Sequence, residues 1–301
     1  MILHIPETLA RQALDRFGRP IPPFDWHRWE NHDSTIIGLA ILALLYLWAI
    51  GPYRRRAGIT ERVPAWRIGS FLAGLVVAFF ALNGPIHDLS DYYLFSVHMA
   101  QHLMLTQLMP PLLLLGVPGF ALTPLARPRW VQAAARWLTR PAIAFSIYTL
   151  SFTGWHLQPA YDLMMRNHNV HIVTHLQFMV TAVIMWWPIL SPMREYPRLP
   201  YGGQMLYLFL IGVPMMLVAA MITLADVVLY PWYSPAPRVL GISPLDDQRY
   251  GGMLMWVPGG MFYWVAMSFV WFVWVKREGE NDAREEAERE GSGPAAATGT
   301  P

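Results

Sequence analysis

Two pairs of histidines are the residues in this sequence best suited to chemistry. His98 and His102 are four positions apart, and so are His171 and His175. Residues at i and i+4 lie on one face of a helix, about 6 Å apart, so the two imidazoles of a pair can share a metal ion. Ionisable residues inside apolar segments are costly and usually functional. The pairs therefore predict one metal site built from both, with His156 as a further candidate ligand.

The chemistry of the available donor atoms favours copper at such a site. The chain has no cysteine, which excludes thiolate ligands, disulfides and iron–sulfur clusters. Neutral imidazole together with thioether suits copper, in particular Cu(I), whereas oxygen-rich sites suit magnesium, calcium or manganese. Met99 lies next to His98 and could supply a thioether, although most of the 17 methionines are expected to fill gaps in the core. We therefore expect copper, with zinc as the alternative.

Carboxylates near the helix ends that carry the histidines could hydrogen-bond to the ring N–H groups that do not face the metal. A carboxylate that accepts the far N–H of a ligand histidine fixes its tautomer. Asp226 is the best candidate for this role because it lies just beyond an apolar run, and Asp162 is a second candidate. Asp88 and Asp91 are expected to be solvated loop charges, and a single histidine such as His87 is expected to be a hydrogen-bonded helix-end residue.

The elements that carry these residues are predicted to cross a membrane. Of the 301 residues, 54% are hydrophobic and only 14% are charged, which is typical of an integral membrane protein rather than a soluble enzyme. The net charge of +2 gives no indication of a nucleic-acid partner. A membrane-spanning helix needs about 20 mostly apolar residues. Seven stretches meet this requirement: 34–51, 66–83, 94–117, 141–157, 171–190, 204–224 and 253–275. The predicted fold is an all-α bundle of seven transmembrane helices.

The distribution of positive charge predicts how this bundle is oriented. Lysine and arginine are concentrated in the loops after the first, third, fifth and seventh spans, beginning with Arg54, Arg55 and Arg56. Because cytoplasmic loops carry an excess of these residues, we expect the N-terminus outside and the C-terminus in the cytoplasm. Both histidine pairs then begin within about two helical turns of the outer surface.

The predicted bundle is flanked by two segments of different composition. Residues 1–33 contain no apolar core with a small-residue cleavage site, so we expect an amphipathic segment on the outer surface rather than a removable signal peptide. Residues 34–275 form the transmembrane domain. Residues 276–301 are charged and then rich in Gly, Ala, Pro and Thr, which predicts a disordered cytoplasmic tail.

Several strings of residues resemble a known family of membrane proteins. Besides the pair His171 and His175, the strings are His98-Met-Ala-Gln-His102, Pro110-Pro111, Trp155-His156-Leu-Gln-Pro159, Gly241-Ile-Ser-Pro244-Leu-Asp-Asp247-Gln248 and Met255-Trp256-Val-Pro258-Gly-Gly260. Over about residues 85–275 the chain is similar to the cytochrome c oxidase assembly factors called CtaG, the type linked to caa-type oxidases. Members often carry an acid before the second histidine of the later pair, where this chain has Thr174. This departure removes a carboxylate from the helix and keeps both histidines.

The resemblance implies a multi-pass plasma-membrane protein that helps to assemble active cytochrome c oxidase by handling copper. Such a protein is not an enzyme. It would hold Cu(I) at the two histidine pairs, with His156 or a methionine completing the site, and pass the metal to an oxidase subunit. The implied partners are oxidase subunits and the lipid bilayer, with no nucleic acid.

Two other functions could use the same residues. A membrane-embedded zinc hydrolase would combine three histidines with Asp162 or Asp226 to activate water at an open zinc position. A b-haem electron carrier would take one axial histidine from each of the two helices that carry the pairs. Against the hydrolase, no carboxylate lies at fixed helical spacing from either pair. The haem carrier does not require paired histidines.

Overall fold

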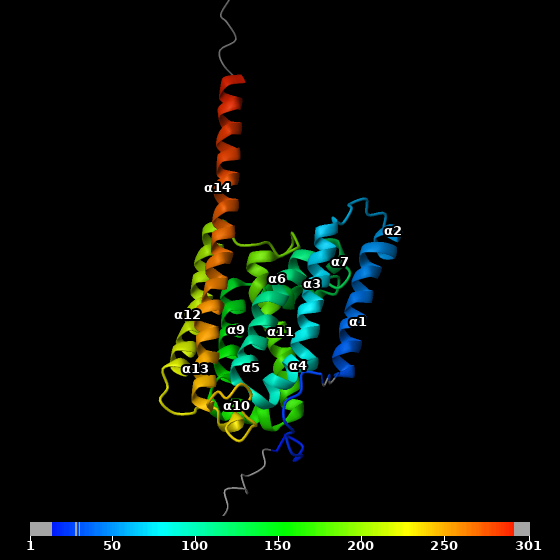
Figure 1. Cartoon of the computed structure of the whole chain (residues 1–301). Helices are drawn as coiled ribbons and strands as arrows, with labels where there is room; N and C mark the ends of the chain where they lie inside the picture. The colour runs from blue at the N-terminus through cyan, green and yellow to red at the C-terminus, as the bar shows by residue number, and fades with distance from the viewer. Residues whose placement is uncertain (1–13, 28, 30, 292–301) are drawn as a thin grey trace, which may run out of the picture.

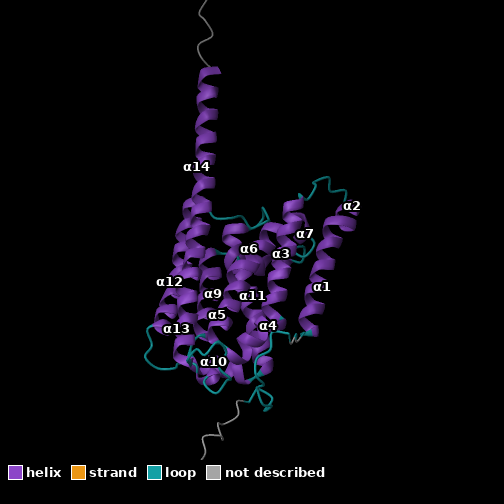
Figure 2. Ribbon diagram, in the orientation of Figure 1, coloured by secondary structure: helices purple, strands orange, loops and turns teal. Residues whose placement is uncertain are grey.

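The protein is a bundle of helices (Figures 1 and 2). The computed structural model describes residues 14–27, 29 and 31–291. These residues form no β-strand, and an isolated antiparallel bridge joins Leu14 to Pro20. The all-α class predicted from the sequence is therefore confirmed.

Within the described part of the chain, five helical runs are long and apolar enough to cross a membrane. In chain order they are Asp33–Arg56, Ala65–Leu82, His168–Leu190, Tyr201–Thr223 and Pro244–Arg289. The predicted spans 94–117 and 141–157 are also helical and contact the third of these runs, but the former contains several buried polar residues and the latter has 15 helical residues. Helices that could span a membrane are thus confirmed, whereas the count of seven and the orientation of the termini stay predictions.

Two of these five runs are assembled from shorter helical segments. The first run consists of α1 (Asp33–Trp48), the π-helical turn η1 (Ala49–Tyr53) and α2 (Arg54–Arg56), and the last consists of α13 (Pro244–Leu254), the π-helical turn η5 (Met255–Gly259) and α14 (Gly260–Gly291). The unbroken runs are α3 (Ala65–Leu82), α9 (Pro141–Trp155), α11 (His168–Leu190) and α12 (Tyr201–Thr223). Between α3 and α9 lie α4 (Gly84–Asp88), the π-helical η2 (Leu89–Tyr93), α5 (Phe95–Leu103), the π-helical η3 (Met104–Leu108), α6 (Met109–Gly116), α7 (Gly119–Leu122) and α8 (Arg129–Leu138). Two short elements complete the order, α10 (Gln158–Arg166) before α11 and the 3-10 turn η4 (Pro231–Tyr233) after α12.

Prolines lie inside the long helices without ending them. Pro188 is inside α11 and Pro214 is inside α12, and both helices continue past them. Pro52 and Pro258 fall within the wide π-helical turns η1 and η5. Proline lacks the N–H that an α-helix requires, and a π turn is one way to accommodate the lost hydrogen bond.

The start of α5 is fixed by a side chain from a distant helix. Asp247 of α13 accepts hydrogen bonds from the backbone N–H of Phe95 at 2.6 Å and of Ser96 at 3.1 Å, and from the Ser96 hydroxyl at 2.5 Å. These contacts satisfy N–H groups that have no partner inside the helix. The same two helices also pack closely at Gly251, where there is no room for a side chain. A Cβ at this position would lie 2.5 Å from a ring carbon of Phe95. The helix that carries His98 and His102 is therefore held rigidly.

The start of α11 is fixed locally. The side chain of Asn167 accepts hydrogen bonds from the backbone N–H of Asn169 at 3.1 Å and of Val170 at 3.2 Å, the N-cap arrangement that asparagine favours. This cap begins the helix three residues before His171. Both histidines of the later pair consequently lie in its first two turns.

The end of α14 differs from the expectation for the C-terminal segment. The helix continues to Gly291 and projects beyond the bundle (Figure 1). Its 276–291 portion is rich in Ala, Glu and Arg, which are good helix formers, and it is supported by i,i+4 ion pairs such as Lys276–Glu280 at 3.9 Å. The expected disordered tail is therefore helical up to Gly291, and residues 292–301 lie outside the described residues.

Candidate metal centre

The two histidine pairs face each other inside the bundle. Within the pairs, the ring centroids are 4.3 Å apart for His98 and His102 and 4.4 Å apart for His171 and His175. Between the pairs, the ring of His175 lies 6.0 Å from that of His98 and 5.6 Å from that of His102. All four side chains are buried. The i,i+4 spacing places the two members of each pair together, and the packing of the bundle places the two pairs side by side.

Three of these histidines form a group with the geometry of a metal site. His98, His102 and His175 each offer a ring nitrogen, and the three nitrogens lie within 4.8 Å of one another. Both ring nitrogens of His102 and the Nε2 atoms of the other two are buried and have no hydrogen-bond partner among the described residues. Burying such polar atoms without partners is costly. A bound metal ion would satisfy them, so the donor set fits a metal.

Hydrogen bonds to backbone carbonyls orient two of the candidate ligands. The Nδ1–H of His98 donates to the carbonyl of Ser90 at 3.2 Å, which leaves its Nε2 lone pair free. The Nδ1–H of His156 donates to the carbonyl of Phe152 at 2.7 Å, and its Nε2 is likewise without a partner. The His156 ring lies 6.1 Å from that of His102. Backbone carbonyls commonly fix the tautomer of metal-binding histidines in this way.

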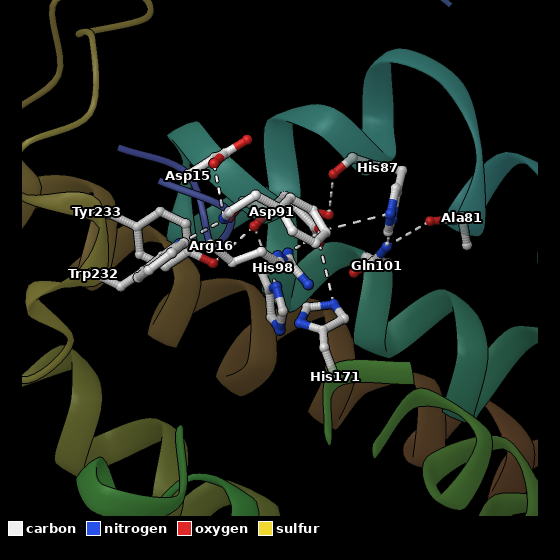
Figure 3. Close-up of polar contacts among 12 residues, drawn as sticks. Asp15, Arg16, Ala81, His87, Asp91, His98, Gln101, His171, Trp232 and Tyr233 are labelled. Carbon is white, nitrogen blue, oxygen red and sulfur yellow. Dashed lines mark hydrogen bonds and ion pairs between the residues drawn. The ribbon is translucent and has the colours of Figure 1, made fainter. Parts of the chain in front are cut away.

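The fourth paired histidine, His171, contacts a carboxylate. Its Nε2 lies 3.2 Å from Oδ1 of Asp91, as Figure 3 shows, while its ring remains 5.9 Å from that of His98. The expectation that Asp91 is a solvated loop charge is wrong, because only 3% of its surface is exposed. Asp88 is buried as well. The short helices α4 and η2 carry these acids into the interior, where the sequence analysis expected a loop.

Asp91 is surrounded by positively charged and polar groups. Nη2 of Arg16, from the N-terminal segment, lies 2.5 Å from its Oδ2, and Nε2 of His87 lies 3.5 Å from the same atom. Burial works against the ionised form, but His171, His87 and the permanently charged Arg16 hold the pKa of Asp91 well below its usual range. Burial also lowers the pKa of His87 to about 4, although Asp91 opposes this shift. At neutral pH the charge of Asp91 is thus balanced mainly by Arg16.

Gln101 of α5, which lies between His98 and His102 in the sequence, connects His87 and Asp91 to this helix. Nε2 of Gln101 donates to the carbonyl of Ala81 at 2.6 Å and to Nδ1 of His87 at 3.0 Å (Figure 3). Because Nδ1 of His87 accepts this bond, its protonated Nε2 faces Asp91. The sequence analysis missed Arg16, Asp91 and Gln101. One local signal was present, because Asp91 follows His87 at the same i,i+4 spacing as the histidine pairs.

The other predicted supporting residues lie elsewhere. The Asp226 side chain is 97% exposed and pairs with Arg249 at 3.4 Å. Asp162 pairs with Arg166 on α10, also at 3.4 Å. Met99 is fully buried in the main hydrophobic core cluster. Within the part of the chain that the structure describes, neither Asp226 nor Asp162 contacts a histidine of the cluster.

The chain is similar to proteins from mycobacteria whose names assign no function. It is 27% identical over 249 residues to an uncharacterized protein from Mycobacterium bovis and to one from Mycobacterium tuberculosis, and equally to one from Mycobacterium leprae. The matched region covers 74% of this chain and 36% of each relative, so the chain spans about a third of the length of these curated relatives. No solved structure matches the chain. Residues 44–277 match the family described as cytochrome c oxidase caa3 assembly factor, Caa3_CtaG, and the chain therefore belongs to that family.

Proposed function

We propose that this protein holds copper as Cu(I) and delivers it to cytochrome c oxidase during assembly of the oxidase. The observation that carries the proposal is the convergence of ring nitrogens from His98, His102 and His175 within 4.8 Å, where the Nε2 atom of each is buried and has no hydrogen-bond partner in the described structure. His156, with its free Nε2 beside His102, is the fourth ligand in this proposal. His171 is held by Asp91 at the edge of the site and can join the ligand set.

The charge of the site supports Cu(I) over zinc. The three converging ligands are neutral imidazoles, and Asp91 is already paired with Arg16, so the described residues of the site offer a buried metal no uncompensated negative charge. Burying an uncompensated charge is expensive, and a single positive charge costs less than a double one. Imidazole ligands also suit copper.

The zinc-hydrolase and haem alternatives receive less support. A hydrolase needs a carboxylate beside the metal to activate water. Asp162 and Asp226, the carboxylates considered for that role, pair with arginines instead. A haem would have to lie between axial histidines of α5 and α11, and the facing rings of His98 and His175 are buried only 6.0 Å apart beside other histidines. An assembly role without catalysis therefore accounts best for the site.

The position of the cluster supports delivery on the outer side of the plasma membrane. The histidines lie at the starts of α5 and α11, near α4 and α10, whereas α2 with its three arginines and the projecting end of α14 lie at the opposite end of the bundle (Figure 1). Because arginine-rich ends favour the cytoplasm, this arrangement agrees with an outward-facing metal site. An oxidase subunit would receive copper there.

Metal content of the purified protein tests the proposal. Detergent-solubilised protein loaded under reducing conditions is expected to bind close to one copper ion and to prefer copper over zinc. A variant with both His98→Ala and His102→Ala should lose most of this copper, because two of the converging nitrogens are removed. The matched control is His27→Ala, since His27 is an exposed histidine outside the cluster. Full copper content in the double variant, or equal loss in the control, would overturn the metal site.

Delivery needs a second measurement in cells. A variant with His102→Ala and His175→Ala should remain in the membrane, while oxidase activity falls and added copper partly restores it. Normal oxidase activity in a stably inserted double variant would refute the delivery function even if the purified protein binds copper.

A further inference from the structure

A cavity of about 590 Å³ lies beside the histidine cluster. Its volume falls within the range of about 300–1,000 Å³ that is usual for sites of small ligands. The walls come from α1, α3, α6 and α11 and are mostly apolar, with Leu39, Leu42, Leu75, Met109 and Leu176 among the lining residues. A small set of polar residues that includes Arg16, Asp91 and His171 also lines it. Apolar walls with a few convergent polar groups are typical of a binding site.

The cavity is open toward the surrounding membrane. Several residues that line it are also substantially exposed: Leu42 at 40%, Ile172 at 49% and Leu176 at 56%. They lie on the predicted membrane-spanning helices α1 and α11, so the solvent that meets them is hydrocarbon. A ligand can therefore enter sideways from the bilayer and leave its tail between these helices.

Two polar atoms of the cavity lack a hydrogen-bond partner among the described residues. Nε of Arg16 and Nδ1 of His171 are buried and form no hydrogen bond with any described residue. Their side chains are 2% and 3% exposed. Nδ1 of His171 is an acceptor, because its Nε2–H faces Asp91, and it could itself bind the copper ion. Nε of Arg16 can only donate, and a copper ion at His98, His102 and His175 would leave it unsatisfied. This donor therefore indicates a second ligand, with an oxygen atom that accepts a hydrogen bond.

Charge and shape narrow the class of this ligand. Arg16 is already neutralised by Asp91, so an anionic head such as a phosphate or a fatty-acid carboxylate would bring an unbalanced negative charge into the interior. The head should be neutral, with oxygen acceptors, and the rest should be hydrocarbon. A quinone has two ring carbonyls, no charge and a single apolar tail. We propose that this cavity binds a membrane quinone, with a ring carbonyl of its head at Nε of Arg16 and its tail between α1 and α11.

Binding of decylubiquinone to the full-length protein in lipid nanodiscs tests this proposal. Quenching of tryptophan fluorescence measures the affinity. Gly38 lines the cavity, and a Cβ at this position would meet nothing within 4 Å, so Gly38→Phe should fill the cavity and reduce quinone affinity at least tenfold. Gly69→Phe is the matched control, because Gly69 is equally open but does not line the cavity. Wild-type affinity in the Gly38 variant, or an equal loss in both variants, would overturn the proposal.

Two further comparisons identify the head group. Arg16→Lys keeps a cation beside Asp91 but lacks the Nε donor, so quinone affinity should fall about tenfold, the effect of one lost hydrogen bond. Palmitate, as an anionic amphiphile with a similar tail, should compete poorly. Competition by palmitate at the same concentration as the quinone, or unchanged affinity in Arg16→Lys, would show that the cavity accepts any hydrocarbon chain and would overturn the quinone assignment.

Copper measured on the same samples separates this proposal from the metal site. Gly38→Phe should retain copper while losing the quinone, and the His98→Ala, His102→Ala variant should lose copper while still binding the quinone. Loss of quinone binding in that histidine variant would contradict a cavity site held by Arg16.

Discussion

The buried ion pair between Arg16 and Asp91 predicts a large loss of stability when its positive partner is removed. The two side chains are only 2% and 5% exposed, so water screens their interaction little. Breaking a buried pair by removing one partner costs about 3–5 kcal/mol, because the remaining charge is left uncompensated. Arg16→Gln removes the charge and keeps a polar side chain. At a few degrees per kcal/mol, the thermal midpoint should fall by on the order of 10 °C.

A neighbouring arginine provides the control for this prediction. Arg19 pairs with Asp15 at 2.8 Å, but its side chain is 70% exposed. Exposed pairs contribute about 0–1 kcal/mol, so Arg19→Gln should shift the midpoint by no more than a few degrees. Thermal unfolding of both variants in detergent, followed by tryptophan fluorescence, compares them directly. Equal shifts would refute the docking of the N-terminal segment onto Asp91.

A double variant distinguishes the ion pair from lost packing. Arg16→Gln combined with Asp91→Asn removes both charges, so much of the loss seen in Arg16→Gln alone should be recovered. An additive, larger loss in the double variant would mean that the two residues stabilise the protein independently.

Four other changes should have measurable effects. Gly251→Ala places a methyl group 2.5 Å from a carbon of Phe95 and should cost about 1–3 kcal/mol, whereas Gly154→Ala, which meets nothing within 4 Å, should not lower the thermal midpoint. Asp247→Ala removes three hydrogen bonds to the start of α5 and should lower both the midpoint and the copper content, with about 0.5–2 kcal/mol lost from the missing cap. Stripping copper with a Cu(I) chelator should lower the midpoint, because a ligand at a hundred times its Kd stabilises the folded state by about 2.7 kcal/mol; an unchanged midpoint would contradict copper binding. Deletion of residues 280–301 should leave the midpoint unchanged, because the described part of this segment is exposed helix outside the bundle, and a fall would show that it supports the fold.

The local features of the fold could be predicted from the sequence, because they depend on short spacings. The histidine pairs lie on single helix faces since residues four apart do so in any α-helix, and their common burial follows from the apolar spans that carry them. The predicted spans 171–190 and 204–224 run through Pro188 and Pro214, and the helices α11 and α12 do the same. The length of α14 was underestimated, because the composition of its final residues masked a helix supported by i,i+4 charge pairs.

The contacts that complete the site could not be predicted, because they join residues far apart in the chain. Arg16 and Asp91 are separated by 75 positions, and Asp247 lies 152 positions from the N–H group of Phe95 that it caps. Neither contact produces a repeating pattern of residues that could be recognised in the sequence. Asp91 was expected to be solvated because it lies between two apolar spans, where a loop is the ordinary connection. The short α4 and η2 helices that bury it depend on tertiary packing.

The projecting end of α14 determines how far Gly291 lies from the bundle. From Lys276 to Gly291 the helix is about 24 Å long, at 1.5 Å per residue. A flexible segment of the same length would let its end return to the membrane surface, whereas a continuous helix holds the end away from it. The acidic and basic side chains around this rod keep it in water and spread both signs of charge along its length. The continuous helix therefore fixes the separation between Lys276 and Gly291, at the end of the bundle opposite the histidines.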